Sequence, residues 1–220
     1  MRRYRHSLWI LLLLLVGSCS NDSPTAGGPR LVFVALGASD AVGVGASPLT
    51  AGYVFLIAND LGEDREVDLR NLGEIGAHSF DIIARQLAST IASSPGLITI
   101  WTGSNDIIGG DSPSSFAADL AQLLGDLQSQ TDAEIFIGDL VDLTRIPRFI
   151  ATPDPDVTSS RVAAFNAAIR AAASTHSARV VPLSSMPITP DLFAIDGFHP
   201  SNSGHRAIAD LFLNEIRSVL

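Results

Sequence analysis

Short apolar runs alternate with longer amphipathic segments along this chain. The apolar runs predict five buried strands, at 31–37, 66–72, 97–101, 134–138 and 179–183. The amphipathic segments predict five helices, at 49–61, 80–92, 115–129, 159–174 and 203–219. Strands that alternate with helices are typical of a parallel sheet covered on both faces. The pattern therefore predicts a three-layer α/β/α domain over residues 31–220, built on a five-stranded parallel sheet of flavodoxin-like topology.

One stretch departs from this periodicity. Three prolines and two aspartates fall within residues 145–157. Because proline interrupts both helices and strands, we expect an irregular loop there.

The first thirty residues differ in composition from the rest. Arg2, Arg3 and Arg5 precede the apolar run Leu8–Val16, and small residues follow it. This order is typical of an export signal, which we predict over residues 1–18. The apolar run is too short to cross a bilayer, which takes about 20 residues.

Cys19 is the only cysteine, so no intramolecular disulfide can form. The segment Val16–Cys19 resembles the lipobox of bacterial lipoproteins, in which the cysteine is lipidated and becomes the mature N-terminus. Residues 19–30 then read as a lipidated cysteine followed by a flexible Gly- and Pro-containing linker. We expect an exported protein tethered to a cell-envelope membrane. The alternative is an ordinary signal peptide that ends near a cysteine.

The chain carries a net charge of −9, and 46% of its residues are hydrophobic. Nucleic acids and anionic membrane surfaces attract basic proteins, so neither is expected as the main partner. The hydrophobic content is ample for a packed core and argues against disorder.

The first candidate for chemistry is Ser39, which follows the first predicted strand in the sequence Gly37-Ala38-Ser39-Asp40. This position places a hydroxyl at the carboxyl edge of the sheet, where open α/β sheets bind ligands. A helix N-cap or a turn is the alternative role for Ser39.

Asp196 and His199 stand three residues apart in a loop before the last predicted helix. On a turn, this spacing lets a carboxylate orient one imidazole nitrogen while the other faces outward. Ser39 would need such a base, because a hydroxyl is a weak nucleophile at its ordinary pKa. The alternative is an Asp–His pair that only holds the loop together.

Two further segments follow predicted strands at the same edge. Asn105, after the third strand, carries a side-chain amide that can donate to a developing oxyanion, although an ordinary turn is the alternative. Gly76, after the second strand, lets a backbone N–H approach a substrate oxygen closely.

These four segments, in this order and spacing, resemble the conserved blocks of the SGNH (GDSL) hydrolases over residues 31–217. The resemblance implies that Ser39 is the nucleophile, His199 the general base and Asp196 the residue that orients it. It also implies an oxyanion hole made of the Ser39 backbone N–H, the Gly76 backbone N–H and the Asn105 side-chain amide.

The nucleophile block departs from the family pattern, which usually reads Gly-Asp-Ser-Leu. Ala38 removes a carboxylate that normally supports this loop, and Asp40 adds one directly after the nucleophile. A negative charge near the oxyanion opposes catalysis if it points inward. Successive side chains need not share a direction, so the sequence leaves the direction of Asp40 open.

No dinucleotide fingerprint, P-loop, Gly-x-Ser-x-Gly elbow or metal-binding spacing is present, so no cofactor and no metal are expected. His78 and His205 are expected at the surface or behind the catalytic residues, and Asp106 within its own turn. Asp139 and Asp142 are read either as pocket-shaping or as solvated carboxylates. Candidates for the walls of a substrate pocket are Ile146, Phe149 and Phe193.

The resulting hypothesis is a serine esterase that acts through an acyl-enzyme on small-molecule carboxylic esters or thioesters, with small acyl chains or lysolipids as substrates. One alternative is a non-catalytic lipoprotein that binds an envelope glycan or lipid on the same scaffold. Another is a carbohydrate O-acetylesterase or an acyltransferase. The oligomeric state cannot be inferred from the sequence.

Overall fold

A computed structural model describes residues 28–220 of the chain. Its core is one five-stranded parallel sheet with the strand order β2-β1-β3-β4-β5. The strands are β1 (Gly28–Gly37), β2 (Arg65–Asn71), β3 (Leu97–Trp101), β4 (Glu134–Gly138) and β5 (Arg179–Val181). The predicted fold class is confirmed.

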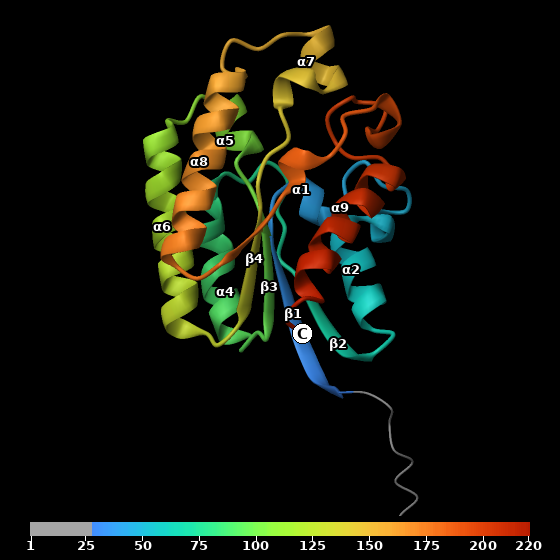
Figure 1. Cartoon of the computed structure of the whole chain (residues 1–220), viewed down its shortest axis with the longest axis vertical. Helices are drawn as coiled ribbons and strands as arrows, with labels where there is room; N and C mark the ends of the chain where they lie inside the picture. Colours follow the sequence, from blue (N-terminus) through green and yellow to red (C-terminus); the bar gives the residue numbers. More distant parts are fainter. Residues whose placement is uncertain (1–27) are drawn as a thin grey trace, which may run out of the picture.

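Two groups of helices cover the sheet (Figure 1). One face is covered by α2 (Tyr53–Leu61) and α9 (Asn202–Ile216). The other is covered by α4 (Leu87–Ala92), α6 (Pro113–Gln130) and α8 (Ser159–Thr175). Because both faces are covered, the central strand β3 is buried at every residue and its sequence is a continuous apolar run.

The N-terminal boundary differs from the expected one. The predicted signal peptide at 1–18, the lipidation site Cys19 and the linker up to residue 27 lie outside the described residues. Residues 28–30, expected in the linker, belong to β1, since Gly28 pairs with Arg65 and the Arg30 side chain bonds to Asp68 at 2.9 Å.

Two predicted helices are interrupted. The first begins as a 3-10 turn, η1 (Leu49–Ala51), and continues as α2 only after Gly52. A side chain at Gly52 would stand 2.6 Å from the Cα atom of Gly43, so the chain turns closely there. The second runs from α3 (Ser79–Asp81) through a π-helical turn, η2 (Ile82–Gln86), into α4.

The loop prediction for 145–157 is wrong in part, because it contains the short helix α7 (Pro147–Ala151). Pro147 occupies the first turn of α7, where the N–H that proline lacks is not needed. The other short elements are α1 (Ser39–Val42), α5 (Ser104–Ile108), η3 (Leu143–Arg145), η4 (Leu183–Ser185) and η5 (Pro190–Leu192).

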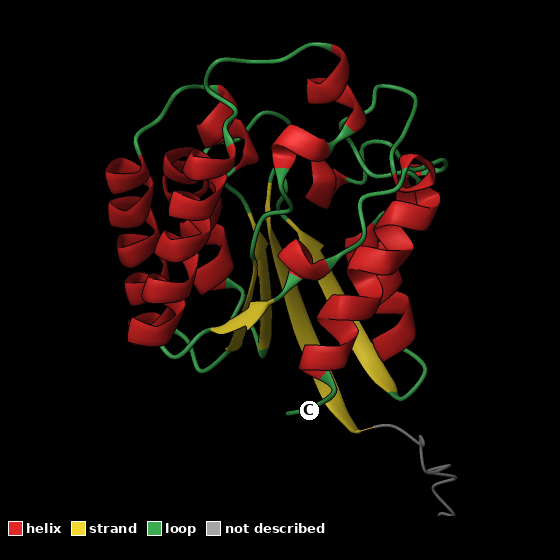
Figure 2. Ribbon diagram, turned by 45° about the horizontal axis from the view of Figure 1, so that its top comes forward, coloured by secondary structure: helices red, strands yellow, loops and turns green. Residues whose placement is uncertain are grey.

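All five strands end at the same edge of the sheet, where α1, α5 and α7 and the longer loops gather (Figure 2). The candidate site residues lie on these connections. Within residues 28–220, no helix is both long and apolar enough to span a bilayer.

Candidate active site

Ser39 is placed by the tight turn that joins β1 to α1. Ser39 is the first residue of α1, a helix of a single turn, and is only 4% exposed. Two residues earlier, both backbone polar groups of Gly37 bond to the buried Gln86 side chain. The Gly37 N–H donates to Oε1 at 3.1 Å, and the Gln86 amide donates to the Gly37 carbonyl at 2.9 Å. The π-helical turn therefore fixes the backbone on which Ser39 stands.

A continuous hydrogen-bonded chain joins Ser39, His199 and Asp196. His199 Nε2 lies 2.9 Å from Ser39 Oγ, and His199 Nδ1 lies 2.6 Å from Asp196 Oδ2. The other carboxylate oxygen, Oδ1, accepts the backbone N–H groups of Phe198 at 2.9 Å and His199 at 3.0 Å. Asp196 thus holds both the ring and the backbone of His199, with the second ring nitrogen directed at the serine.

Electrostatics favour the ionised form of Asp196. Burial on its own would raise the pKa of this carboxyl. The hydrogen bonds from the His199 ring and from the two backbone N–H groups outweigh that effect, so the pKa of Asp196 lies below its usual value. An ionised carboxylate at this position stabilises the imidazolium that forms when His199 accepts a proton.

The loop after α1 is packed directly against the loop that carries His199. Gly45 has a φ of +96°, and a side chain there would collide with the Pro200 carbonyl.

His205, in α9, is completely buried. Its Nδ1 accepts the backbone N–H of Tyr53 at 3.2 Å, and its Nε2 donates to the Val44 carbonyl at 3.1 Å. His205 therefore supports the catalytic loops from behind.

Asn105 and the chain neighbours of Ser39 and Gly76 line one hollow beside the nucleophile turn. It is lined by Ala38, Asp40, Ala77, Trp101, Thr102, Gly103, Ser104, Asn105 and Phe198. The backbone N–H groups of Ser39 and Gly76 have no hydrogen-bond acceptor within residues 28–220. The Asn105 amide uses one hydrogen to bond the Ala77 carbonyl at 2.9 Å, which leaves its second hydrogen for a ligand.

A deeper, mostly apolar pocket adjoins this hollow. Its walls include Trp101, Val141, Leu143, Met186, Ile188, Leu192, Phe198 and Ile208. Two of the three expected wall residues, Ile146 and Phe193, line it. The third, Phe149, lines a separate surface hollow next to Asp196 and His199.

Asp40 stands between the two hollows, because it lines both of them. The direction that the sequence left open is therefore inward. Burial raises the pKa of Asp40 from 3.8 to about 6, and the nearby carboxylate of Asp196 adds to the rise, while His199 opposes it. A carboxyl group with a raised pKa thus lines both hollows beside Ser39.

Comparisons with known proteins identify the family of this chain. A family model described as the GDSL-like Lipase/Acylhydrolase family matches residues 22–207. The chain belongs to this family. It is accordingly an enzyme that hydrolyses ester bonds with a serine nucleophile. The comparison with curated proteins gave no match.

Several solved structures share the fold of this GDSL-like hydrolase. TesA superposes with a TM-score of 0.72 at 20% identity, covering 86% of this chain and 99% of TesA. EstA, a psychrotrophic esterase from Pseudoalteromonas sp., superposes with a TM-score of 0.70 at 19% identity, covering 86% of this chain and 97% of EstA. Axe2, an acetylxylan esterase from Geobacillus stearothermophilus, superposes with a TM-score of 0.68 at 20% identity, covering 87% of this chain and 95% of Axe2.

Other polar residues considered from the sequence lie outside the catalytic arrangement of this hydrolase. Asp139 is neither solvated nor at a pocket wall, since it is buried and bonds the Ser184 N–H and hydroxyl, each at 2.7 Å. Asp142 caps η3 by accepting the Thr144 N–H at 3.1 Å. Asp106 reaches beyond its own turn to Ser79, and His78 pairs with Asp111 at 2.7 Å.

The sequence interpretation missed three residues that shape the site. Gln86 appears in the sequence as an ordinary helix position, yet it holds the nucleophile turn. The Tyr53 hydroxyl and the Trp101 indole N–H are buried without a partner among the described residues. Burial and the nearby Asp40 charge both raise the pKa of Tyr53. One available signal was Gln86 itself, a polar residue on the apolar side of a predicted helix.

Proposed function

We propose that this hydrolase cleaves small carboxylic esters through an acyl-enzyme on Ser39. The observation that carries the proposal is the unbroken chain of hydrogen bonds from Ser39 through His199 to Asp196. This arrangement lets an imidazole remove the serine proton while a carboxylate stabilises the resulting positive charge.

The proposed reaction has two halves. In the first, Ser39 Oγ attacks the ester carbonyl as its proton passes to His199 Nε2, and the N–H groups of Ser39, Gly76 and Asn105 receive the oxyanion. His199 then protonates the departing alcohol. In the second half, His199 takes a proton from water, hydroxide attacks the acyl-enzyme, and Ser39 recovers its proton. Each well-placed oxyanion donor typically stabilises such a transition state by about 3 kcal/mol.

The apolar pocket supports an acyl chain as the buried part of the substrate. Its walls are aliphatic and aromatic side chains, and it opens next to the nucleophile. Exposed apolar side chains also follow the strand ends at this edge. They are Leu49, Ile75, Phe80, Ile150 and Ile195.

We also propose that a lipid on Cys19 tethers the enzyme with its site facing away from that membrane. β1 begins at the end of the sheet opposite the catalytic loops (Figure 1). Nine peptide bonds separate Cys19 from Gly28, and this connection reaches about 30 Å at most when fully extended. The ten residues of β1 alone cover a similar distance of about 33 Å. The tether is therefore too short for the rim to turn onto the same bilayer, which favours soluble esters over membrane-resident lysolipids.

A panel of p-nitrophenyl esters from acetyl to palmitoyl, together with acetylated sugars, tests the function. We expect turnover of the shorter acyl esters that disappears in Ser39→Ala and in His199→Ala. Turnover that survives in both variants would contradict the roles given to Ser39 and His199. No turnover with any ester would contradict the proposal and favour a binding protein. Preference for acetylated sugars would assign carbohydrate deacetylation. Products formed on an added sugar acceptor would assign acyl transfer.

Membrane attachment is tested separately with Cys19→Ser. The variant should move from the membrane fraction to the soluble fraction while keeping its esterase activity. Unchanged fractionation would contradict the lipid anchor without affecting the esterase assignment.

A further inference from the structure

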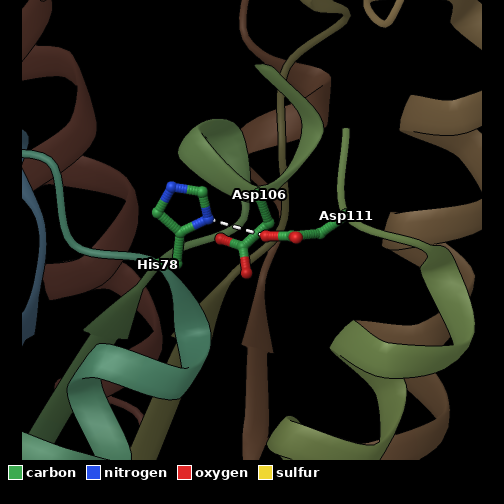
Figure 3. Close-up of side chains that lie close together, drawn as sticks. All are labelled: His78, Asp106 and Asp111. Atoms are coloured by element: carbon green, nitrogen blue, oxygen red, sulfur yellow. Dashed lines mark hydrogen bonds and ion pairs between the residues drawn. The ribbon is translucent and has the colours of Figure 1, made fainter. Parts of the chain in front are cut away.

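A second cluster of reactive side chains lies beside the oxyanion loops and has no role in the reaction proposed above. His78, Asp106 and Asp111 each offer one ligand atom, and these atoms all lie within 4.8 Å of one another (Figure 3). His78 belongs to the loop between β2 and α3, whereas Asp106 lies in α5 and Asp111 follows that helix. The cluster therefore joins two separate connections at the catalytic edge.

Asp106 is the buried member of the cluster and is only 1% exposed. Its Oδ1 atom accepts the backbone N–H of Ser79 at 2.9 Å and the Ser79 hydroxyl at 2.6 Å. Its Oδ2 atom is buried and has no partner among the described residues. An unpartnered carboxylate oxygen inside a protein is costly, and its carboxyl group lies beside the His78–Asp111 pair (Figure 3).

No arginine side chain within residues 28–220 forms an ion pair with Asp106. Asp119 adds a further negative group, since the same Ser79 hydroxyl lies 2.8 Å from its Oδ2. The guanidinium of Arg161 donates to the backbone carbonyls of Ile107 and Asp111. Arg85 pairs instead with Glu74 and Asp81. Burial raises the pKa of Asp106, and the Ser79 hydrogen bonds and His78 oppose the rise.

We propose that His78, Asp106 and Asp111 form a binding site for a divalent transition-metal cation, Zn²⁺ or Mn²⁺. One imidazole nitrogen with two carboxylates is a donor set for these ions, whereas Ca²⁺ takes six to eight oxygen ligands. The cation would take the place of the proton now held between His78 Nδ1 and Asp111 Oδ2, 2.7 Å apart. It would also give the orphaned Asp106 oxygen a partner.

Such an ion would act on the oxyanion hole through the backbone. His78 stands two residues after Gly76, and Asp106 stands next to Asn105. The two loops already touch through the bond from Asn105 to the Ala77 carbonyl. A cation that ligates both loops would fix the positions of the oxyanion donors relative to each other. It would therefore stabilise the fold and raise kcat without contacting the substrate.

Isothermal titration of the tag-free full-length chain with ZnCl₂, MnCl₂ and CaCl₂ tests the site. We expect one saturable site per chain for Zn²⁺ or Mn²⁺, much weaker binding of Ca²⁺, and a Tm that rises by about 5 °C or more at a hundredfold excess over Kd. Asp111→Asn should abolish this binding. Asp119→Asn is the matched control, because it removes a charge from the same surroundings but not a ligand, and it should still bind the metal.

Absence of saturable Zn²⁺ or Mn²⁺ binding would overturn the proposal and identify the cluster as a metal-free His78–Asp111 pair beside a buried carboxyl group. Equal losses in Asp111→Asn and Asp119→Asn would also overturn it, since general attraction by negative charge would then explain the binding. The inactive Ser39→Ala variant should bind the metal as tightly as the wild type. The metal site and the esterase assignment can therefore fail independently.

Discussion

His199 Nε2 lies 2.9 Å from Ser39 Oγ, although 160 positions separate the two residues in the chain. The contact depends on how the start of α9 is fastened to the loop after α1. Asn202 bonds the Ser47 backbone twice, accepting its N–H at 2.8 Å and donating to its carbonyl at 2.9 Å. His205 makes a second connection to the same loop through Val44. The nucleophile and its base are therefore positioned by neighbouring backbone contacts as well as by their own hydrogen bond.

Asp196→Asn should reduce kcat by about two to four orders of magnitude, because the neutral amide no longer stabilises a charged His199 or fixes its tautomer. The same change affects stability. The lowered pKa of Asp196 means that its contribution is present above the ordinary aspartate pKa and is lost as pH falls through the folded-state value. Thermal unfolding at several pH values should give a higher Tm for the wild type than for Asp196→Asn at pH 7, and equal Tm values in strong acid. An unchanged kcat would contradict the role given to Asp196.

Asp40→Asn should change the pH dependence of activity. Ionised Asp40 faces the hollow that receives the oxyanion and opposes the charge that develops there. Because the pKa of Asp40 is about 6, the wild type carries this charge at pH 8 and mostly lacks it at pH 5. Relative to wild type, the kcat/KM of the variant for a neutral ester should be near unity at pH 5 and several-fold higher at pH 8. A ratio that does not vary with pH would show that Asp40 does not act on the reaction electrostatically.

The same raised pKa makes Asp40 a source of instability at high pH. Between pH 3.8 and about 6, the folded protein holds a proton on Asp40 that the unfolded chain has released. Stability therefore falls as pH rises through this range. Asp40→Asn should raise the free energy of unfolding at pH 8 by on the order of 1–3 kcal/mol and leave it nearly unchanged at pH 4.

Urea denaturation at both pH values measures this difference, and Asp132→Asn, which alters an exposed aspartate before β4, serves as the control. A lower stability of Asp40→Asn at pH 8 would show that the ionised carboxylate has a stabilising partner in solution.

Gln86→Ala should weaken both the fold and the activity. The substitution removes the side-chain acceptor of the buried Gly37 N–H and one of two donors to the Gly37 carbonyl, which keeps the Glu74 N–H at 3.1 Å. The expected cost is about 2–4 kcal/mol, which corresponds to a fall in Tm of roughly 5–10 °C. Esterase activity at 20 °C should also fall, because the turn that carries Ser39 loses its support. Gln122→Ala, at an exposed position of α6, should change neither quantity.

Hydrophobic periodicity predicted the sheet and its main helices, because buried strands and amphipathic helices have direct sequence signals. The short elements were not predicted by this periodicity. Pro147 marked a break in the pattern, yet it begins α7. Asp106 was expected within a turn, and a turn was the alternative for Asn105, although both lie in α5, which starts at Ser104. Four- and five-residue helices are too short to show a period, and their positions are set by tertiary contacts.

The candidate site could be assembled from the sequence because its four segments each follow a strand or precede a helix at one edge. The contacts that support the site could not be predicted from the sequence. Gln86 reaches Gly37 through a π-helical turn, and the inward direction of Asp40 depends on the backbone of a single helical turn. The His78–Asp106–Asp111 cluster joins two loops whose proximity only the folded chain establishes.

Covalent labelling of Ser39 by a fluorophosphonate, located by mass spectrometry of peptides, tests the central claim most directly. The reagent forms an Oγ–P bond and releases fluoride, and His199 accelerates this step by activating the serine. The account predicts a single adduct on Ser39 in the wild type, at least a hundredfold slower labelling in His199→Ala, and none in Ser39→Ala. An adduct on another residue, or labelling of Ser39 at the same rate without His199, would contradict it.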